Sequence, residues 1–112
     1  MKISEKGALL RIFVGEADRH QGKPLYEQIV LKAREIGLAG ATVTRGIMGY
    51  GAASRIHTSK VLRLSEDLPI VIEIVDTQAK LERLLPFLDE VVEEGLVTIE
   101  MAQVLVYKHK NS

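Results

Sequence analysis

The chain has 112 residues, of which 46% are hydrophobic, with 15 basic and 15 acidic side chains and no cysteine. This length fits one domain, and the apolar content is typical of a folded protein rather than a disordered one. A formal net charge of zero gives no electrostatic basis for binding DNA or RNA, and the lack of cysteine excludes disulfides and thiolate metal ligands. We therefore expect a single domain over residues 1–112 that does not bind nucleic acid.

The N-terminal residues 1–6 are polar and lead directly into an apolar segment, which is unlike a signal peptide. No apolar run in the sequence reaches the length of a membrane span. We therefore expect a cytoplasmic protein without membrane insertion.

The first half of the sequence predicts a strand, a helix and a second strand. The first strand is expected over residues 8–15, and the polar residues 16–23 read as a loop. Pro24 fits the first position of a helix, since its missing N–H is not needed there. Apolar side chains then recur at helical spacing as far as Gly37. The second strand is expected over residues 41–48.

The second half predicts a strand, a helix and a final strand. Residues 68–75 are rich in β-branched side chains, which favour a strand. Asp76 or Thr77 can cap the helix that follows, and Pro86 is expected to kink that helix or split it in two. A long last strand is expected over residues 97–107.

The predicted order βαββαβ is the ferredoxin-like pattern, an α+β sandwich with a four-stranded antiparallel sheet. Two helices can cover only one face of such a sheet. The strands are apolar on both faces, because Ile70, Ile72 and Ile74 point one way while Val71 and Val75 point the other. We therefore expect self-association to bury the second face; the alternative is a monomer with an exposed apolar face.

Residues 46–59 combine glycines with one aromatic, several hydroxyls, and the side chains of Arg55 and His57. A glycine-rich backbone with N–H groups beside cationic side chains suits an anion, most simply a phosphate. In the simpler alternative, Gly49 and Gly51 only let the strand turn into a loop, because glycine readily takes positive φ. Arg55 and His57 are then ordinary residues of a solvated loop.

A second group of cations precedes the first predicted helix. Arg19, His20 and Lys23 lie close in sequence to its N-terminus, which is a natural site for anions. The same residues are equally typical of an exposed polar turn. Both readings remain open from the sequence.

Four segments carry a resemblance to a known family. They are Ile36 to Thr44 (Ile-Gly-Leu-Ala-Gly-Ala-Thr-Val-Thr), Gly49-Tyr50-Gly51, Leu68-Pro69 leading to Ile72–Val75, and Val104–Tyr107. On these segments the chain resembles the PII-like proteins, the uncharacterised branch related to the nitrogen-regulatory PII signalling proteins. Residues 18–26 are similar to that branch rather than to PII itself.

The resemblance implies a homotrimer that binds an adenine nucleotide (ADP, AMP or ATP) in clefts between its subunits. It also implies that residues 49–67 form a loop that senses the ligand and contacts a regulated partner, such as a transporter or an enzyme. The implied ligand contacts, together with the candidate phosphate-binding cations, are Thr42, Thr44, Gly49, Tyr50, Gly51, Arg55, His57, Arg19 and Lys23.

Several positions depart from the PII pattern. Ala52 and Ala53 stand where PII has a glutamine that helps to hold magnesium and 2-oxoglutarate. The modified tyrosine of the PII loop has no counterpart, because Tyr50 lies within the glycine turn. Residues 108–110 supply two lysines and a histidine in place of two arginines that grip the outer phosphates. The resemblance therefore implies AMP or ADP more readily than magnesium-bound ATP, and magnesium is not supported.

Catalytic and metal sites find little support. The three histidines, His20, His57 and His109, lack metal-ligand spacing, and Ser54 and Ser59 near His57 lack an orienting acid. We therefore expect a non-enzymatic protein with no catalytic residues and no metal site. Two alternatives remain: a metal-binding trimer like CutA, with one histidine from each subunit at an axis, and a slow nucleotide hydrolase in the same cleft.

Overall fold

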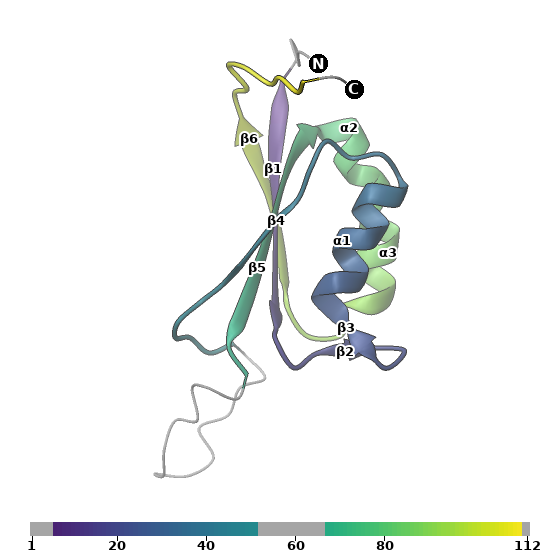
Figure 1. The fold of residues 1–112 in the computed structure, drawn as a ribbon, viewed down its shortest axis with the longest axis vertical. Coiled ribbons are helices and arrows are strands. Elements are labelled where there is room, and N and C mark those ends of the chain that lie inside the picture. Colours follow the sequence, from purple (N-terminus) through teal and green to yellow (C-terminus); the bar gives the residue numbers. More distant parts are fainter. Residues whose placement is uncertain (1–5, 52–66, 111–112) are drawn as a thin grey trace.

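The structure, a computed structural model, describes residues 6–51 and 67–110. Figure 1 shows one sheet, seen nearly edge-on, with all the helices on one side of it. Its strands are β1 (Gly7–Gly15), β4 (Thr42–Arg45), β5 (Pro69–Thr77) and β6 (Leu96–Ala102). Neighbouring strands are antiparallel, in the order β4-β5-β1-β6 across the sheet. The predicted ferredoxin-like α+β sandwich is confirmed.

A short hairpin, within residues that the sequence predicts as a loop, lies between β1 and the first helix. Its strands are β2 (Arg19–His20) and β3 (Lys23–Pro24). The two turn residues, Gln21 and Gly22, have φ values of 54° and 79°. Two consecutive positive φ angles match the right-handed twist of the flanking strands, and glycine adopts such angles at little cost. Gly22 was the one residue of this segment whose type indicated a tight turn in the sequence.

The first helix, α1 (Leu25–Glu35), begins one residue later than predicted, because Pro24 is extended and precedes the first turn. The helix stops near Gly37, as expected. Gly37 has a φ of 86°, and the N–H of Leu38 donates to the Ala33 carbonyl at 3.0 Å. This backward hydrogen bond satisfies a terminal carbonyl of the helix and redirects the chain toward β4.

The second helical region is broken into three short pieces, α2 (Gln78–Leu81), η1 (Glu82–Leu84, a 3-10 turn) and α3 (Leu85–Val91). Thr77 caps the region as predicted, because its Oγ1 accepts a hydrogen bond from the N–H of Lys80 at 3.3 Å. Pro86 lies in the first turn of α3. A proline is tolerated there but not in a helix interior, which accounts for the predicted split.

The hydrophobic core fills the space between the helices and one face of the sheet. Its members alternate along β1 and β5 and recur at helical spacing in α1 and in the second helical region. They are Ala8, Leu10, Ile12, Val14, Leu25, Ile29, Ala33, Ile70, Ile72, Ile74, Leu81, Leu84, Leu88 and Val91. Burying one such leucine or isoleucine side chain contributes about 1.5–3 kcal/mol. Among the described polar and charged residues, Asp76 alone is equally buried, with 1% of its surface exposed.

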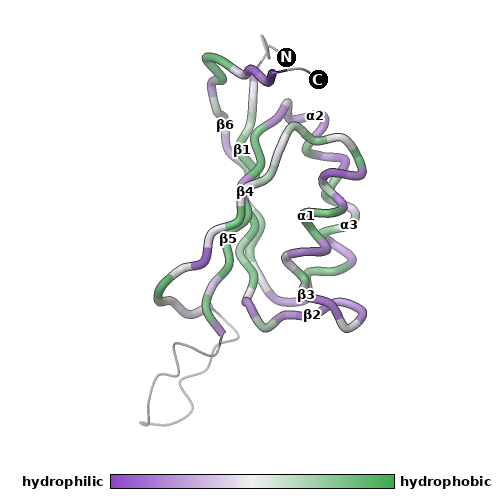
Figure 2. The backbone as a smooth tube through the Cα atoms, viewed as in Figure 1, coloured by the Kyte–Doolittle hydropathy of each residue, from purple (hydrophilic) through white to green (hydrophobic). Residues whose placement is uncertain are grey.

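No helix within residues 6–51 and 67–110 lies on the opposite face of the sheet, and we call it the open face. The strand register places Leu9, Phe13, Val71 and Val75 on it, together with the charged residue Arg11. Figure 2 colours long stretches of the strands as hydrophobic, even though helices line only one side. The predicted pattern of apolar side chains on both faces is therefore confirmed.

Strand β4 is shorter than the predicted 41–48 and ends at Arg45. Its partner β5 starts at Pro69, which has no N–H with which to extend the ladder. The last contact is the N–H of Gly46, which donates to the Pro69 carbonyl at 2.7 Å. Sequence periodicity did not report this limit because it lies in the partner strand.

Strand β6 is also shorter than the predicted 97–107 and ends at Ala102, opposite Gly7, the first residue of β1. The chain then crosses tightly over Gly7, where an added Cβ would lie 2.9 Å from Val104 Cγ2. Residues 103–110, which we call the C-terminal segment, cross the end of the sheet without joining a strand (Figure 1).

Candidate functional site

The edge strand β4 displays two of the predicted ligand-contact residues. Thr42 pairs with Glu73 and Thr44 with Val71, so both threonines lie on the open face. All four residues of β4 are exposed. The Thr44 hydroxyl lies 3.5 Å from the Val71 carbonyl oxygen, which is a long contact that leaves the hydroxyl available to a stronger partner.

The glycines that follow β4 pack against a proline rather than supplying positive φ. A Cβ added to Gly46 would lie 2.7 Å from Pro69 Cγ, and one added to Gly49 would lie 3.0 Å from the same atom. Positive φ is found among the described glycines at Gly22 and Gly37 only. The positive-φ interpretation of Gly49 and Gly51 is therefore wrong, and close approach to Pro69 accounts for Gly46 and Gly49.

The side chains between these glycines point into solvent. Ile47 is 94% exposed, Tyr50 is 78% exposed, and Met48 is also largely exposed. Three apolar or aromatic side chains are thus displayed on a short segment whose backbone is anchored on Pro69. The segment can offer an aromatic ring and apolar surface to a ligand or a protein.

The far end of the 46–67 segment is fastened to the end of β1. The N–H of Ala17 donates to Asp67 Oδ1 at 2.9 Å, and the N–H of Glu16 donates to the Leu68 carbonyl at 2.9 Å. Glu16 also pairs with Arg45, whose Nε lies 3.3 Å from Glu16 Oε2. Both ends of the segment therefore meet at one end of the sheet. The predicted residues Arg55 and His57 lie outside the described residues.

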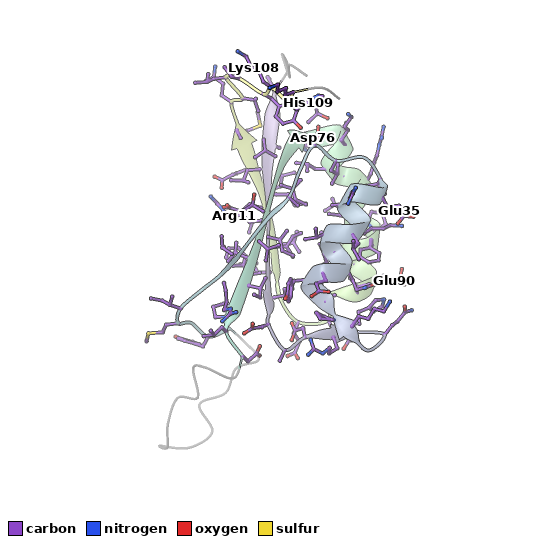
Figure 3. The ribbon with its side chains drawn as sticks, in the orientation of Figure 1. Arg11, Glu35, Asp76, Glu90, Lys108 and His109 are labelled. Atoms are coloured by element: carbon purple, nitrogen blue, oxygen red, sulfur yellow. The ribbon has the colours of Figure 1, made fainter. Side chains whose placement is uncertain are left out.

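The remaining predicted cations lie away from β4 within one chain. Arg19 and Lys23 belong to the β2–β3 hairpin, which sits under α1, whereas the chain after β4 leaves the other side of the sheet (Figure 1). Lys108 and His109 lie at the opposite end of the sheet from that segment (Figure 3). A single chain thus places Thr42 and Thr44 on β4 and Gly49 beside Pro69 at the start of the partner strand β5, and does not add these cations to them.

The open face carries a charged cluster in its centre. Arg11 Nε donates to Glu73 Oε2 at 2.7 Å, and Arg11 Nη1 also pairs with Glu100 Oε1. The hydrogen bond to Glu73 raises the pKa of the Arg11 guanidinium above its ordinary value. Figure 3 shows Arg11 extending from the sheet on the side away from the helices. The charges that interrupt this apolar face are therefore already paired.

Metal binding finds no ready-made site in the part of the chain that the structure describes. No group of three His, Cys, Asp or Glu side chains gathers there. His20 packs edge-on against Phe87, with ring centroids 6.3 Å apart, and His109 lies against Tyr107.

None of the helices in residues 6–51 and 67–110 is long and apolar enough to cross a membrane.

Three residues that organise this region were missed by the sequence analysis as site components. Asp76 Oδ2 accepts a hydrogen bond from the N–H of Ala39 at 2.9 Å, and the Tyr107 hydroxyl donates to the Ala39 carbonyl at 2.9 Å. Ala39 precedes Thr42 by three residues. An aspartate at the end of an apolar strand and a tyrosine among valines were visible signals, but their common partner was not.

The family of the chain is shown by comparison with known sequences. Residues 7–104 match the DUF190 family model, which is described as uncharacterized ACR. The chain belongs to the DUF190 family. A relative, the UPF0166 protein of Aquifex aeolicus, is 42% identical over 107 residues, which cover 94% of this chain and 98% of that protein.

Several solved structures similar to this DUF190 chain are described as PII-like. A PII-like signalling protein of Thermus thermophilus, TTHA0516, is 19% identical with a TM-score of 0.62, over 88% of this chain and 89% of that one. CPII of Thiomonas intermedia K12, described as a nitrogen regulatory PII-like protein bound to ADP, AMP and bicarbonate, is 17% identical with a TM-score of 0.64. That match covers 93% of this chain and 98% of CPII. The DUF190 chain therefore has the PII-like fold that its sequence motifs indicated.

Proposed function

We propose that this protein is a PII-like sensor that binds an adenine nucleotide between subunits and signals to a partner protein without catalysing a reaction. The observation that carries the proposal is the fold shared with CPII, whose structure holds ADP and AMP. The exposed Thr42 and Thr44 of the edge strand β4 support it, as does the exposed Tyr50 between the two glycines that follow this strand. A sensor of adenine nucleotides belongs in the cytoplasm, where these ligands occur.

The assembly we propose is a homotrimer that covers the open face. Val75, Leu96 and other large apolar side chains on this face are exposed in the single chain. An apolar surface of this kind costs free energy in water and favours a protein partner. The contact of Arg11 with both Glu73 and Glu100 lowers the electrostatic cost of burying the face, since each carboxylate has a cationic partner and the cluster keeps one net negative charge.

The proposed cleft starts at β4, because this strand is at the edge of the sheet and a second subunit can approach it. Tyr50 offers an aromatic face on which an adenine ring can stack, and the Thr42 and Thr44 hydroxyls offer hydrogen bonds. Phosphate-binding cations then come from Arg55 and His57 of the loop, or from Arg19 and Lys23 of a neighbouring subunit. AMP and ADP suit this arrangement better than ATP, and magnesium has no part in it.

The signal we propose is a change in the 49–67 loop. A nucleotide can shift the loop between two states only if it binds one of them more tightly. The loop is well placed for this, because it follows β4, which carries Thr42 and Thr44, and hydrogen bonds of Gly46 and Asp67 fasten the flanking chain to β5 and to the end of β1. The regulated protein, a transporter or an enzyme, would recognise the loop in one of these states.

Titration calorimetry with AMP, ADP and ATP, with and without magnesium, tests the proposal. We expect AMP or ADP to bind without magnesium, and Thr42→Val to weaken binding by about tenfold through the loss of one hydrogen bond to a polar ligand. Lys32→Ala changes a side chain of α1 in the helix layer, away from both β4 and the open face, and serves as the control. Sedimentation velocity gives the oligomeric state. No binding of any of the three nucleotides would refute the proposal.

A further inference from the structure

The connection between α1 and β4 is held from two sides at one residue, Ala39. The Ala39 N–H donates to Asp76 Oδ2 at 2.9 Å, and the Ala39 carbonyl accepts from the Tyr107 hydroxyl at 2.9 Å. Asp76 lies at the end of β5, 37 residues away, and Tyr107 lies in the C-terminal segment, 68 residues away. Distant parts of the chain therefore converge on the backbone of a single residue.

Asp76 is the fixed side of this arrangement. It is 1% exposed and lies on the core side of β5, near the end of the strand and opposite Ala8. Its second oxygen, Oδ1, accepts from the N–H of Thr77 at 2.7 Å, just before α2 begins. Both carboxylate oxygens are thus used, and moving the side chain would leave a buried charged group without its hydrogen bonds, which is costly.

Tyr107 is the less buried side of the arrangement. It lies in a segment that has left the strand ladder, and its neighbours Leu105 and Val106 are largely exposed. Its ring is partly buried beside His109, and its hydroxyl reaches across to the α1–β4 connection. Because the backbone of the C-terminal segment is outside the sheet and its neighbouring side chains face solvent, this hydrogen bond is suited to opening and closing.

The connection from Ala39 to β4 is short. Its start is fixed by the hydrogen bond from Leu38 to Ala33 at the end of α1. Gly40 follows, with nothing within 4 Å of an added Cβ, and β4 begins at Thr42. Thr42 is the third residue after Ala39, so a shift of Ala39 is carried directly into the strand that displays Thr42 and Thr44.

We propose that Tyr107 and Asp76 are positioning residues for the nucleotide cleft, with the Tyr107–Ala39 hydrogen bond acting as a latch between the C-terminal segment and β4. This inference rests on the proposed function, because it assigns a role to the latch at the same site. The closed latch holds β4 in the geometry that binds nucleotide. By linkage, a bound nucleotide must then favour the closed latch by the same factor.

Tyr107→Phe tests the latch, because it removes the hydroxyl and keeps the ring. Hydrogen exchange of the free protein should become about threefold to tenfold faster at residues 38–42, as expected for the loss of one net hydrogen bond. Exchange in β1 and β5 should stay unchanged, which separates a local latch from general loss of stability. Tyr26→Phe, in α1, is the matched control and should leave residues 38–42 unchanged.

The link to the cleft is tested with ADP. We expect ADP to bind Tyr107→Phe about threefold to tenfold more weakly than the unaltered protein, and to slow exchange at residues 103–108 in the unaltered protein only. Asp76→Asn provides a second variant, since it keeps the side-chain shape and weakens the other contact to Ala39. Its effect on ADP affinity should be less than additive with that of Tyr107→Phe.

Two results would overturn the latch while leaving the proposed function intact. One is unchanged exchange at residues 38–42 in Tyr107→Phe, and the other is an ADP affinity equal to that of the unaltered protein. If the unaltered protein binds no adenine nucleotide, both the proposed function and the positioning role are refuted. The outcomes therefore distinguish failure of the latch from failure of the site.

Discussion

Arg11 and Glu73 form an ion pair in the middle of the open face of the sheet, with 2.7 Å between Arg11 Nε and Glu73 Oε2. They come from the two central strands of the sheet and are direct neighbours in the β1–β5 register. Glu100 of β6 contacts the same guanidinium. The charged side chains at the centre of the apolar open face therefore contact one another, and in this paired state another protein surface can cover them at lower cost.

Replacing Arg11 with alanine should weaken self-association. The change leaves Glu73 and Glu100 near each other without their cation, and covering two unpaired carboxylates is unfavourable. We expect roughly tenfold or more weaker association, by analogy with truncating one partner of a buried charge pair. Sedimentation velocity across a concentration series measures the change.

The control for this experiment is Lys32→Ala. Lys32 pairs with Glu35 within α1, on the helix layer rather than the open face. It should leave the association constant unchanged. Adding Glu73→Gln and Glu100→Gln to Arg11→Ala should restore part of the association, because no unpaired charge is then buried. Equal association by Arg11→Ala and the unaltered protein would show that the open face is not the contact surface.

Thr77→Ala should destabilise the fold by about 1 kcal/mol, within the range of roughly 0.5–2 kcal/mol for loss of an N-cap. The Thr77 Oγ1 accepts from the N–H of Lys80 in the first turn of α2, where helical N–H groups have no partner within the helix. Urea unfolding followed by circular dichroism measures the difference. Thr98→Ala, an exposed threonine in β6, should change stability far less, and equal losses for both variants would speak against a capping role.

Gly95→Ala should destabilise the fold by about 1–3 kcal/mol, the usual range for steric overpacking. An added Cβ would lie 2.5 Å from the Phe13 carbonyl oxygen and 3.0 Å from Val92 Cγ1. A backbone oxygen in a strand cannot move aside as a flexible side chain can. Gly40→Ala is the matched control, because its Cβ meets nothing within 4 Å. Unfolding midpoints in urea report both effects, and a neutral Gly95→Ala would contradict the crowding.

The sequence was sufficient for the fold because its main signals are local. Alternating isoleucines in β5, the helical spacing of α1 and the Thr77 cap each depend on nearby residues, and together they specify the order of the elements. The strand ends were predicted less well. Arg45 ends β4 because Pro69 begins the partner strand, and Ala102 ends β6 because Gly7 begins β1. Such limits depend on register, which a single segment does not contain.

The candidate site was likewise predictable only where its residues are close together in the sequence. The Thr42–Thr44 and Gly49–Gly51 motifs were recognisable because each is contiguous in sequence. The hydrogen bonds at Ala39 were not, since they join residues 37 and 68 positions apart and both use the backbone of an unremarkable alanine. Tyr107 read as a strand residue for the same reason. Only the folded chain brings these groups within reach of one another.

A substitution at Gly46, at the start of the loop after β4, can distinguish two reasons for a glycine there: steric crowding by Pro69 and the need for a flexible backbone. Gly46→Ala places a Cβ 2.7 Å from Pro69 Cγ, so the loop must shift and the Gly46 hydrogen bond to the Pro69 carbonyl must lengthen. We expect a loss of about 1–3 kcal/mol in stability and weaker ADP binding, because Gly49 and Tyr50 move with the loop. Urea unfolding and calorimetry measure the two effects.

Pro69→Ala provides the decisive partner variant, because it removes the ring atom that the new Cβ at position 46 would meet and keeps the backbone carbonyl that accepts the hydrogen bond. Alone, it should cost about 0.4–1 kcal/mol through greater freedom of the unfolded chain. In the double variant, Gly46→Ala should cost much less than it does beside Pro69, which is a favourable coupling between adjacent sites. Strictly additive losses would mean that glycine is needed at position 46 for backbone freedom, and that contact with Pro69 does not set the course of the loop.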